Sequence, residues 1–207
     1  MVATRPTVGV LALQGAFREH GLVLRGLGAE VREVRLATQL EGLDALVIPG
    51  GESTTMGKLM ESYGLTEPLR RFAAGHPVLG SCAGLILLSR RTAEGAQPLL
   101  GMLDITVRRN AFGRQLHSFE GPVQLRFPGR PAETFPGVFI RSPWVEETGP
   151  GVEIIATYED RIVGVRQGNL LGVAFHPELT DDNRIHRYFL EMAAEAAGSG
   201  AVETEVA

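Results

Sequence analysis

The stretch Pro77–Leu88, PVLGSCAGLILL, joins a short apolar run to a helical run and decides the fold. Pro77–Gly80 has the length and apolar character of a buried strand, and Ala83–Arg90 follows at once with the character of a helix. Glycines flank the junction and allow a turn that is too tight for larger side chains. A strand that passes directly into a helix is the building unit of parallel sheets, so this stretch predicts an α/β fold.

The first half of the chain repeats this alternation of short apolar runs and helical patterns. Strands are predicted over Thr7–Leu13, Glu30–Val34 and Ala45–Ile48, and helices are predicted over Phe17–Leu27, Met56–Tyr63 and Glu67–Ala74. Strands that alternate with helices indicate βαβ units, whose parallel sheet is covered by helices on both faces.

The second half of the chain has a different pattern, in which short runs are separated by turn residues. Strands are predicted over Ile105–Val107, Val123–Arg126, Gly137–Ile140 and Glu153–Thr157, a hairpin over Arg161–Arg166 and Leu170–Phe175, and a helix over Asp181–Ala197. We therefore expect a three-layer αβα sandwich, with a mostly parallel central sheet and antiparallel additions in the second half. We expect one domain over residues 1–197 and a flexible polar tail over residues 198–207.

The composition excludes several classes of protein. The chain has 207 residues, 44% of them hydrophobic and 21% charged, which is ordinary globular usage and excludes a disordered or fibrous chain. A net charge of −4 argues against binding to nucleic acid or to an anionic membrane. The single cysteine, Cys82, excludes an intrachain disulfide and a four-cysteine metal site. We see no signal peptide and no apolar run of about 20 residues, so we expect a soluble cytoplasmic protein with a free thiol.

The junction Gly80-Ser81-Cys82-Ala83-Gly84 matches the nucleophile elbow G-x-S-x-G, with cysteine in place of serine. Such a turn projects its central residue at the carboxyl end of the sheet, where the N-terminus of the following helix stabilises a thiolate. A single cysteine in a glycine-rich turn is more often a buried structural residue. The flanking glycines and the strand-to-helix position favour a nucleophile here.

The segment Phe175-His176-Pro177-Glu178 follows the second strand of the predicted hairpin. Residues two apart in an extended chain point to the same side, so Glu178 can reach the imidazole of His176. A Cys–His pair needs such a carboxylate, which fixes the tautomer and stabilises the imidazolium. A histidine beside an unrelated surface glutamate is the alternative. Together with the elbow, the pair predicts a triad of Cys82, His176 and Glu178.

The loop Pro49–Thr55, PGGESTT, follows another predicted strand and opens a helix. Consecutive glycines expose backbone N–H groups, which could form half of an oxyanion hole or hold a carboxylate. Its spacing fits neither a P-loop nor a dinucleotide fingerprint, so nucleotide binding is disfavoured. A turn followed by a helix cap needs no function at all.

The remaining histidines and several arginines carry no recognisable pattern. No two of the histidines have a metal-ligand spacing, and we interpret them as surface or locally satisfied residues: His20, His76, His117 and His186. We therefore expect no metal site and no cofactor. The run Arg108-Arg109-Asn110 and Arg141 could contact an anion or lie on the solvated surface, and the surface is the default interpretation.

Taken together, these motifs resemble those of the class I glutamine amidotransferases, and within them the glutaminase subunits of pyridoxal 5'-phosphate synthase. The resemblance rests on six stretches in order, Gly9–His20, Pro49–Met56, Cys82–Ile86, Arg109–Gln115, Phe139–Arg141 and Phe175–Thr180. They cover nearly the whole chain except its tail.

The resemblance implies that Cys82 attacks the side-chain amide of L-glutamine, with His176 as base and acid and Glu178 as its orienting partner. It implies an oxyanion hole from the backbone N–H groups of Gly51 and Ala83. It also implies that glutamine is bound by Gly51, Glu52, Ser53, Arg109, Ile140 and Arg141.

The resemblance further implies a partner that receives the ammonia. This is the (β/α)8-barrel synthase subunit, which combines ammonia with a pentose phosphate and a triose phosphate. In the family, twelve glutaminase subunits surround a dodecameric synthase.

Three other functions stay open at this point. One is an amidotransferase that feeds another acceptor, which would keep the triad but not the PGGESTT loop. Another is a stress or repair protein of the same broad fold that uses Cys82 without a glutaminase triad. The third is a binding module in which Cys82 is inert.

Overall fold

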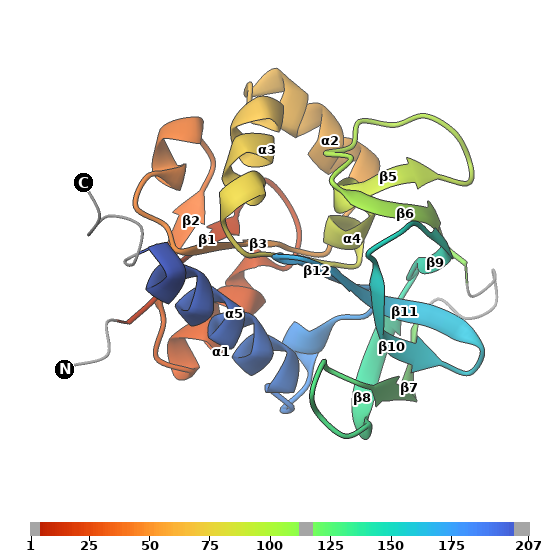
Figure 1. Cartoon of the computed structure of the whole chain (residues 1–207). Helices are drawn as coiled ribbons and strands as arrows, with labels where there is room; N and C mark the ends of the chain where they lie inside the picture. The colour runs from red at the N-terminus through yellow and green to blue at the C-terminus, as the bar shows by residue number, and fades with distance from the viewer. Residues whose placement is uncertain (1–4, 112–117, 201–207) are drawn as a thin grey trace.

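The computed structural model describes residues 5–111 and 118–200, and its elements follow the alternation expected in the first half of the chain (Figure 1). In this half the strands are β1 (Thr7–Leu11), β2 (Glu30–Val34), β3 (Ala45–Ile48), β4 (Val78–Ser81) and β5 (Ser89–Thr92). The helices are α1 (Phe17–Gly26), the 3-10 turn η1 (Ala37–Leu40), α2 (Ser53–Ser62), α3 (Thr66–Gly75) and α4 (Ala83–Leu88).

The second half adds mainly strands. They are β6 (Leu103–Arg108), β7 (Ser118–Leu125), β8 (Glu133–Ile140), β9 (Trp144–Thr148), β10 (Glu153–Tyr158), β11 (Arg161–Gln167) and β12 (Leu170–Val173). The 3-10 turn η2 (Pro177–Leu179) and the helix α5 (Arg184–Gly200) follow.

The sheet changes from parallel to antiparallel at β12. The strands β2, β1, β3, β4 and β12 lie side by side in that order and are all parallel. Beyond β12 the order continues through β11, β10, β7 and β8, and each of these pairs is antiparallel. The expected fold class, a mostly parallel central sheet with antiparallel additions in the second half, is confirmed.

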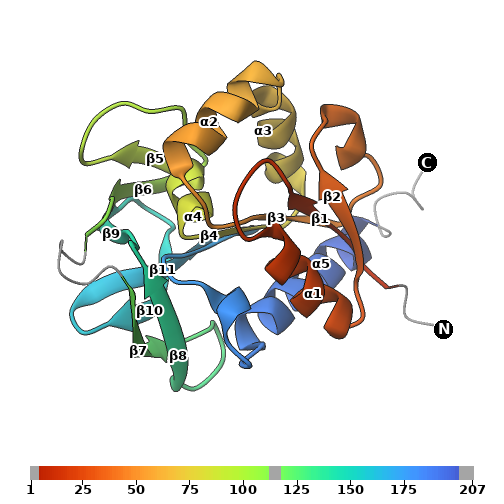
Figure 2. The same cartoon turned by 180° about the vertical axis from the view of Figure 1, so that it is seen from behind.

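Helices cover both faces of the parallel part (Figures 1 and 2). The helices α1 and α5 lie next to each other on one face, and α2, α3 and α4 lie on the other. Every residue of β3, β4 and β12 is buried, as expected for strands between two helical layers. The carboxyl ends of β3 and β4 therefore meet at one edge of this core, where the PGGESTT loop and the glycine-rich elbow begin.

The elements β2 and β3 have the predicted bounds, whereas several others differ. The predicted helix over Ala83–Arg90 ends at Leu88, because Ser89 is extended and its hydroxyl donates to the Ile86 carbonyl at 2.7 Å. The chain then continues as β5, which pairs with β6 and was not predicted. The strand β9 was not predicted either, and it bridges β6 and β11.

The C-terminal helix is also shifted, since α5 starts three residues after the predicted Asp181 and continues past Ala197 to Gly200. Residues 201–207 of the predicted tail lie outside the described residues, so the predicted domain limits stay a prediction. No helix in the described part of the chain is both long and apolar enough to cross a membrane.

Candidate active site

The elbow that carries Cys82 is built by close packing between strand and helix. The backbone of Cys82 has φ +48°, a left-handed conformation that is rare for a residue with a side chain and that marks a strained turn. Gly84 allows this turn, because a Cβ there would lie 2.0 Å from the carbonyl oxygen of Ile48. The Cys82 N–H donates to the Val173 carbonyl at 2.8 Å, so the elbow is tied to the end of β12.

His176 follows β12 and is held by the antiparallel part of the sheet. Its backbone N–H donates to the Val138 carbonyl of β8 at 2.8 Å. Its ring Nδ1 lies 2.7 Å from Oε1 of Glu178, and both side chains are buried. The predicted contact is present, but the expected extended backbone is wrong, since Pro177–Leu179 forms the 3-10 turn η2. Proline at the first position of the turn favours this conformation.

The electrostatics of the pair suit proton transfer. Burial alone would lower the pKa of His176, but hydrogen bonds to Cys82 and Glu178 and the charges of both outweigh it and raise this pKa to about 10. Burial alone would raise the pKa of Glu178, yet the charge of His20 and the contacts of the carboxylate with His176 and His20 hold this pKa well below its usual range. Glu178 is therefore a carboxylate at neutral pH, and His176 readily accepts a proton beside Cys82.

A cavity of about 350 Å³ opens over Cys82 and His176. All six residues that the resemblance assigns to glutamine line it: Gly51, Glu52, Ser53, Arg109, Ile140 and Arg141. Glu178 and Ala83 do not line this cavity. The structure thus gathers residues from the two halves of the chain around one sulfur atom.

The glycines of the site bring two loops into close contact behind His176. A Cβ at Gly50 would lie 2.5 Å from Cε1 of the His176 ring. A Cβ at Gly15 would lie 1.8 Å from the Gly50 carbonyl oxygen, and Gly15 has φ +91°. The Gly50 carbonyl accepts from Ala16 N–H at 3.0 Å, which fixes the PGGESTT loop beside the imidazole.

Glu52 is engaged within the protein. It caps α2, since its carboxylate accepts from Thr54 N–H at 3.1 Å and from Thr55 N–H at 2.8 Å. The hydrogen bond with the Thr55 hydroxyl is the largest cause that lowers the pKa of Glu52 to about 2. Its Oε1 also lies 3.8 Å from Nη2 of Arg109, so the Glu52 carboxylate offsets part of the positive charge of Arg109.

Two glutamines that sequence reasoning missed support the cavity. Gln97 Oε1 accepts from Arg109 Nη1 at 2.7 Å and so holds the guanidinium over the cavity. Gln14 Oε1 accepts from the Glu52 N–H at 2.8 Å. Gln14 lies in a stretch that carried the family resemblance, whereas Gln97 lies in a loop without a recognisable signal.

Backbone atoms complete the wall of the cavity. The Ile140 carbonyl oxygen lies 3.9 Å from the Cys82 sulfur, and the Ile140 N–H is occupied by the Ser142 hydroxyl at 3.0 Å. Arg141, with φ +46°, is a second residue in the left-handed region at this site. Ala83 is the first residue of α4, so its N–H has no acceptor within the helix.

The other histidines occupy different environments. His76 is exposed and stacks on Phe72, with ring centroids 4.3 Å apart, so it is a locally satisfied surface residue. His20 and His186 are fully buried and bonded to each other at 2.9 Å. Both belong to the buried sides of α1 and α5, so of the two predicted alternatives local satisfaction applies and surface exposure does not. His117 lies outside the described residues. Within residues 5–111 and 118–200, no three His, Cys, Asp or Glu side chains are placed to hold a metal ion.

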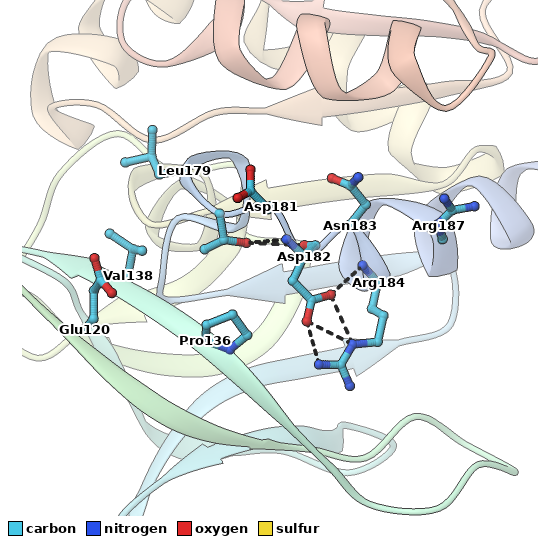
Figure 3. A pocket seen from close by; sticks show the side chains of 10 residues that line it. Glu120, Pro136, Val138, Leu179, Asp181, Asp182, Asn183, Arg184 and Arg187 are labelled. Carbon is cyan, nitrogen blue, oxygen red and sulfur yellow. Dashed lines mark hydrogen bonds and ion pairs between the residues drawn. The ribbon is translucent and has the colours of Figure 1, made fainter.

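A larger cavity, of about 760 Å³, lies between β7, β8 and the start of α5 (Figure 3). Neither histidine nor cysteine is among the side chains drawn around it. Two of its charged side chains form an ion pair, since Arg184 Nε lies 3.0 Å from both carboxylate oxygens of Asp182. We assign no chemistry to this cavity.

Comparisons with known proteins show which family this chain is similar to. A model of the SNO glutamine amidotransferase family matches residues 10–195. The chain is similar to "Pyridoxal 5'-phosphate synthase subunit PdxT" of Geobacillus kaustophilus, with 56% identity over 190 residues that cover 91% of this chain and 95% of the relative. The protein of the same description from Moorella thermoacetica is 56% identical over 186 residues, which cover 89% of this chain and 98% of the relative.

Solved structures show the same likeness. The crystal structure of a glutamine amidotransferase has a TM-score of 0.84 and 50% identity, and the match covers 90% of this chain and 98% of the other. The structure of PurLQS from Thermotoga maritima has a TM-score of 0.67 at 16% identity, with 93% and 97% covered, so it shares the fold alone.

Proposed function

Because the chain belongs to the SNO glutamine amidotransferase family, we propose that it hydrolyses L-glutamine to L-glutamate and ammonia through Cys82, His176 and Glu178. The observation that carries this proposal is the 2.7 Å contact between His176 Nδ1 and Glu178, on an imidazole that lines the same cavity as Cys82. This contact leaves Nε2 for the proton of the nucleophile. A protein that used Cys82 for redox chemistry alone would not need this contact between His176 and Glu178.

The first half of the reaction forms a thioester. His176 accepts the thiol proton, and the Cys82 sulfur attacks the carbonyl carbon of the glutamine side-chain amide. The resulting oxyanion is held by the N–H groups of Gly51 and Ala83, where one such donor is typically worth about 3–4 kcal/mol. As the C–N bond breaks, His176 gives its proton to the nitrogen, and ammonia leaves.

The second half releases the product. A water molecule gives a proton to His176 as its oxygen attacks the thioester carbonyl. The C–S bond breaks, the sulfur takes up the proton from His176, and glutamate leaves. Glu178 stays a carboxylate throughout and holds the imidazole in one orientation. These steps use only side chains of this chain and water.

The charges of the cavity suit the two ends of glutamine. We propose that Arg109, held by Gln97, binds the α-carboxylate and that the Ile140 carbonyl accepts from a donor group of the substrate; both residues line the cavity. Glu52 limits the excess of positive charge at the cavity mouth and contributes through its backbone. Ser53 and Arg141 add polar contacts.

The ammonia is used by a partner. Ammonia in neutral water is mostly protonated and is then no nucleophile, so a biosynthetic glutaminase must deliver it directly. The curated relatives are subunits of pyridoxal 5'-phosphate synthase, and the chain is the glutaminase subunit of such an enzyme. We propose that its partner is the (β/α)8-barrel synthase subunit in a 12+12 assembly, located in the cytoplasm. There the ammonia joins a pentose phosphate and a triose phosphate to form pyridoxal 5'-phosphate.

The test is ammonia release from L-glutamine by the purified chain, with and without the synthase subunit of the same organism. The variant Cys82→Ala is the control. We expect release that requires Cys82 and rises sharply when the synthase is added. Equal release with and without the synthase would overturn the proposed partner and keep the glutaminase. No release in either case would overturn the triad.

A further inference from the structure

A second histidine lies behind the triad, on the side of Glu178 that faces away from the cavity. His20 of α1 and His186 of α5 are fully buried where the two helices lie next to each other (Figures 1 and 2). His20 does not line the cavity over Cys82. We propose that His20 is a positioning residue, which holds the second carboxylate oxygen of Glu178 and thereby orients His176 toward Cys82.

The two oxygens of Glu178 are divided between two histidines. Oε1 lies 2.7 Å from Nδ1 of His176, and Oε2 lies 3.2 Å from Nε2 of His20. Oε2 is fully buried and has no aligned hydrogen bond among the described residues. A buried carboxylate oxygen without a partner is costly, so the contact with the His20 ring is what compensates its burial. Removal of that ring would leave Glu178 free to turn away from His176.

His20 also contacts the residue before the nucleophile. Its Nε2 lies 2.9 Å from the Ser81 hydroxyl, and Ser81 is fully buried at the end of β4. Nε2 of His20 therefore faces both the Glu178 carboxylate and the end of β4 that precedes Cys82. Because Nε2 faces oxygen atoms on both sides, it carries a hydrogen in this arrangement.

His186 supports His20 from behind. Its Nε2 lies 2.9 Å from Nδ1 of His20, so His20 is held at both ring nitrogens. Burial and the charge of His20 lower the pKa of His186 to about 3, so His186 is a neutral imidazole at physiological pH. The titratable groups around Glu178 are thus His20 from α1, His186 from α5, His176 on its own segment, and Cys82 beyond His176.

Two substitutions at His20 separate its effect on the orientation of Glu178 from its effect on the packing of α1 against α5. In His20→Asn, the side-chain amide reaches only the position of Nδ1, so the contact with His186 is kept and the contacts with Glu178 and Ser81 are lost. In His20→Gln, the longer side chain places an amide N–H near the position of Nε2. His76→Asn is the matched control, because His76 is an exposed histidine that precedes β4, at the opposite end of this strand from Cys82, and does not line the cavity over Cys82.

Two quantities are measured from pH 5 to pH 9. Only the second of them depends on the proposed glutaminase activity. The first is the rate at which iodoacetamide alkylates the full chain, which has Cys82 as its single cysteine. The second is kcat and KM for glutamine hydrolysis in the presence of the synthase. If the wild-type chain releases no ammonia, the proposed function fails, while the alkylation profile still tests His20.

We expect His20→Asn to lower kcat at least about tenfold, as loss of an outer partner commonly does, with KM changed less than about twofold. We expect the acid limb of both pH profiles to move to higher pH, because the pKa of Glu178 rises. His20→Gln should restore most of kcat, and His76→Asn should behave as wild type. Wild-type kcat and acid limbs in His20→Asn would overturn the proposal, and so would a His20→Gln variant as impaired as His20→Asn.

If His20→Asn does not fold, NMR of the ring N–H groups in the wild-type chain decides. The His20 signal is assigned from its absence in His20→Gln. A His20 Nε2–H that is protected from exchange and shifts when Cys82 is alkylated supports the proposal. A signal that is unaffected by alkylation overturns it, because a residue coupled to the triad must sense its charge.

Discussion

Substitution of Gly50 by alanine tests whether the position of His176 is set by the loop beside it. The new Cβ would lie 2.5 Å from Cε1 and 3.0 Å from Nδ1 of the imidazole. The backbone of Gly50 is not in the left-handed region, so alanine adds no backbone strain there. The loop cannot recede freely, since the Gly50 carbonyl is bonded to Ala16 N–H at 3.0 Å. The imidazole must therefore move.

The size of the effect follows from these distances. Carbon atoms in contact prefer about 3.5–4.0 Å, so the ring must shift by roughly 1 Å. Such a shift lengthens the 2.7 Å contact of His176 with Glu178 beyond hydrogen-bond range. Misplacement by about 1 Å commonly costs about a hundredfold in rate, so we expect kcat to fall by at least that factor. Overpacking should cost about 1–3 kcal/mol of stability, which lowers Tm by roughly 2–12 °C.

The assay is ammonia release with the synthase present, together with thermal unfolding and the alkylation rate of Cys82. Gly75→Ala is the matched control, because a Cβ at this exposed end of α3 meets nothing within 4 Å. It should keep full activity and gain about 0.5 kcal/mol of stability from the less flexible unfolded chain. A Gly50→Ala protein with wild-type kcat and Tm would show that the imidazole is not confined by this loop.

Three further substitutions test separate parts of the site. Glu178→Gln should lower kcat about 10³–10⁴-fold in the ammonia assay. The glutamine amide would donate to Nδ1 of His176 and force the ring hydrogen onto Nε2, the atom that must accept a proton in the reaction. A loss of kcat below tenfold would contradict this role of Glu178. Arg109→Lys should raise KM about tenfold with little change in kcat, since lysine cannot bond Gln97 and the substrate together; an unchanged KM would remove Arg109 from the binding site. Glu52→Gln should lower Tm at pH 7, because the charged carboxylate that caps α2 stabilises the fold. The difference in Tm between wild type and variant should vanish as the pH falls from about 4.5 to about 2, since the pKa of Glu52 is lowered to about 2 in the folded protein. A difference in Tm that is independent of pH between 2 and 7 would refute this role of Glu52.

The parallel half of the fold could be predicted because its strands are buried on both faces. Ala45–Ile48 is a continuous apolar run that ends at Pro49, so pattern and structure coincide in β3. The strand β5 could not be predicted, because SRRT is polar and becomes a strand only through pairing with β6. Its start also shortened the predicted helix, since Ser89 bonds back to the Ile86 carbonyl.

The candidate site likewise combines residues that short sequence motifs predict with residues that only tertiary packing brings together. Cys82 and the His176–Glu178 pair stand in short motifs, so their spacing along the chain was enough to predict them as candidate site residues. His20 and His186 are 166 positions apart, and only the packing of α1 on α5 brings their rings together. Gln97 is likewise 12 positions from Arg109 in a loop without regular spacing. Such contacts leave no periodic trace in a single sequence.

In the proposed mechanism the antiparallel extension is part of the catalytic apparatus, because it positions His176 relative to Cys82. Cys82 follows directly after β4, and its N–H donates to the Val173 carbonyl of β12. The chain that continues from β12 is then held from the other side, since Ala174 N–H bonds to Val163 of β11 and His176 N–H bonds to Val138 of β8. The parallel half alone would present Cys82 without an imidazole, and the extension alone would present His176 without a sulfur. Among the described strands, β12 alone pairs with the parallel half through β4 and with the antiparallel extension through β11, so its two edges set the geometry between Cys82 and His176.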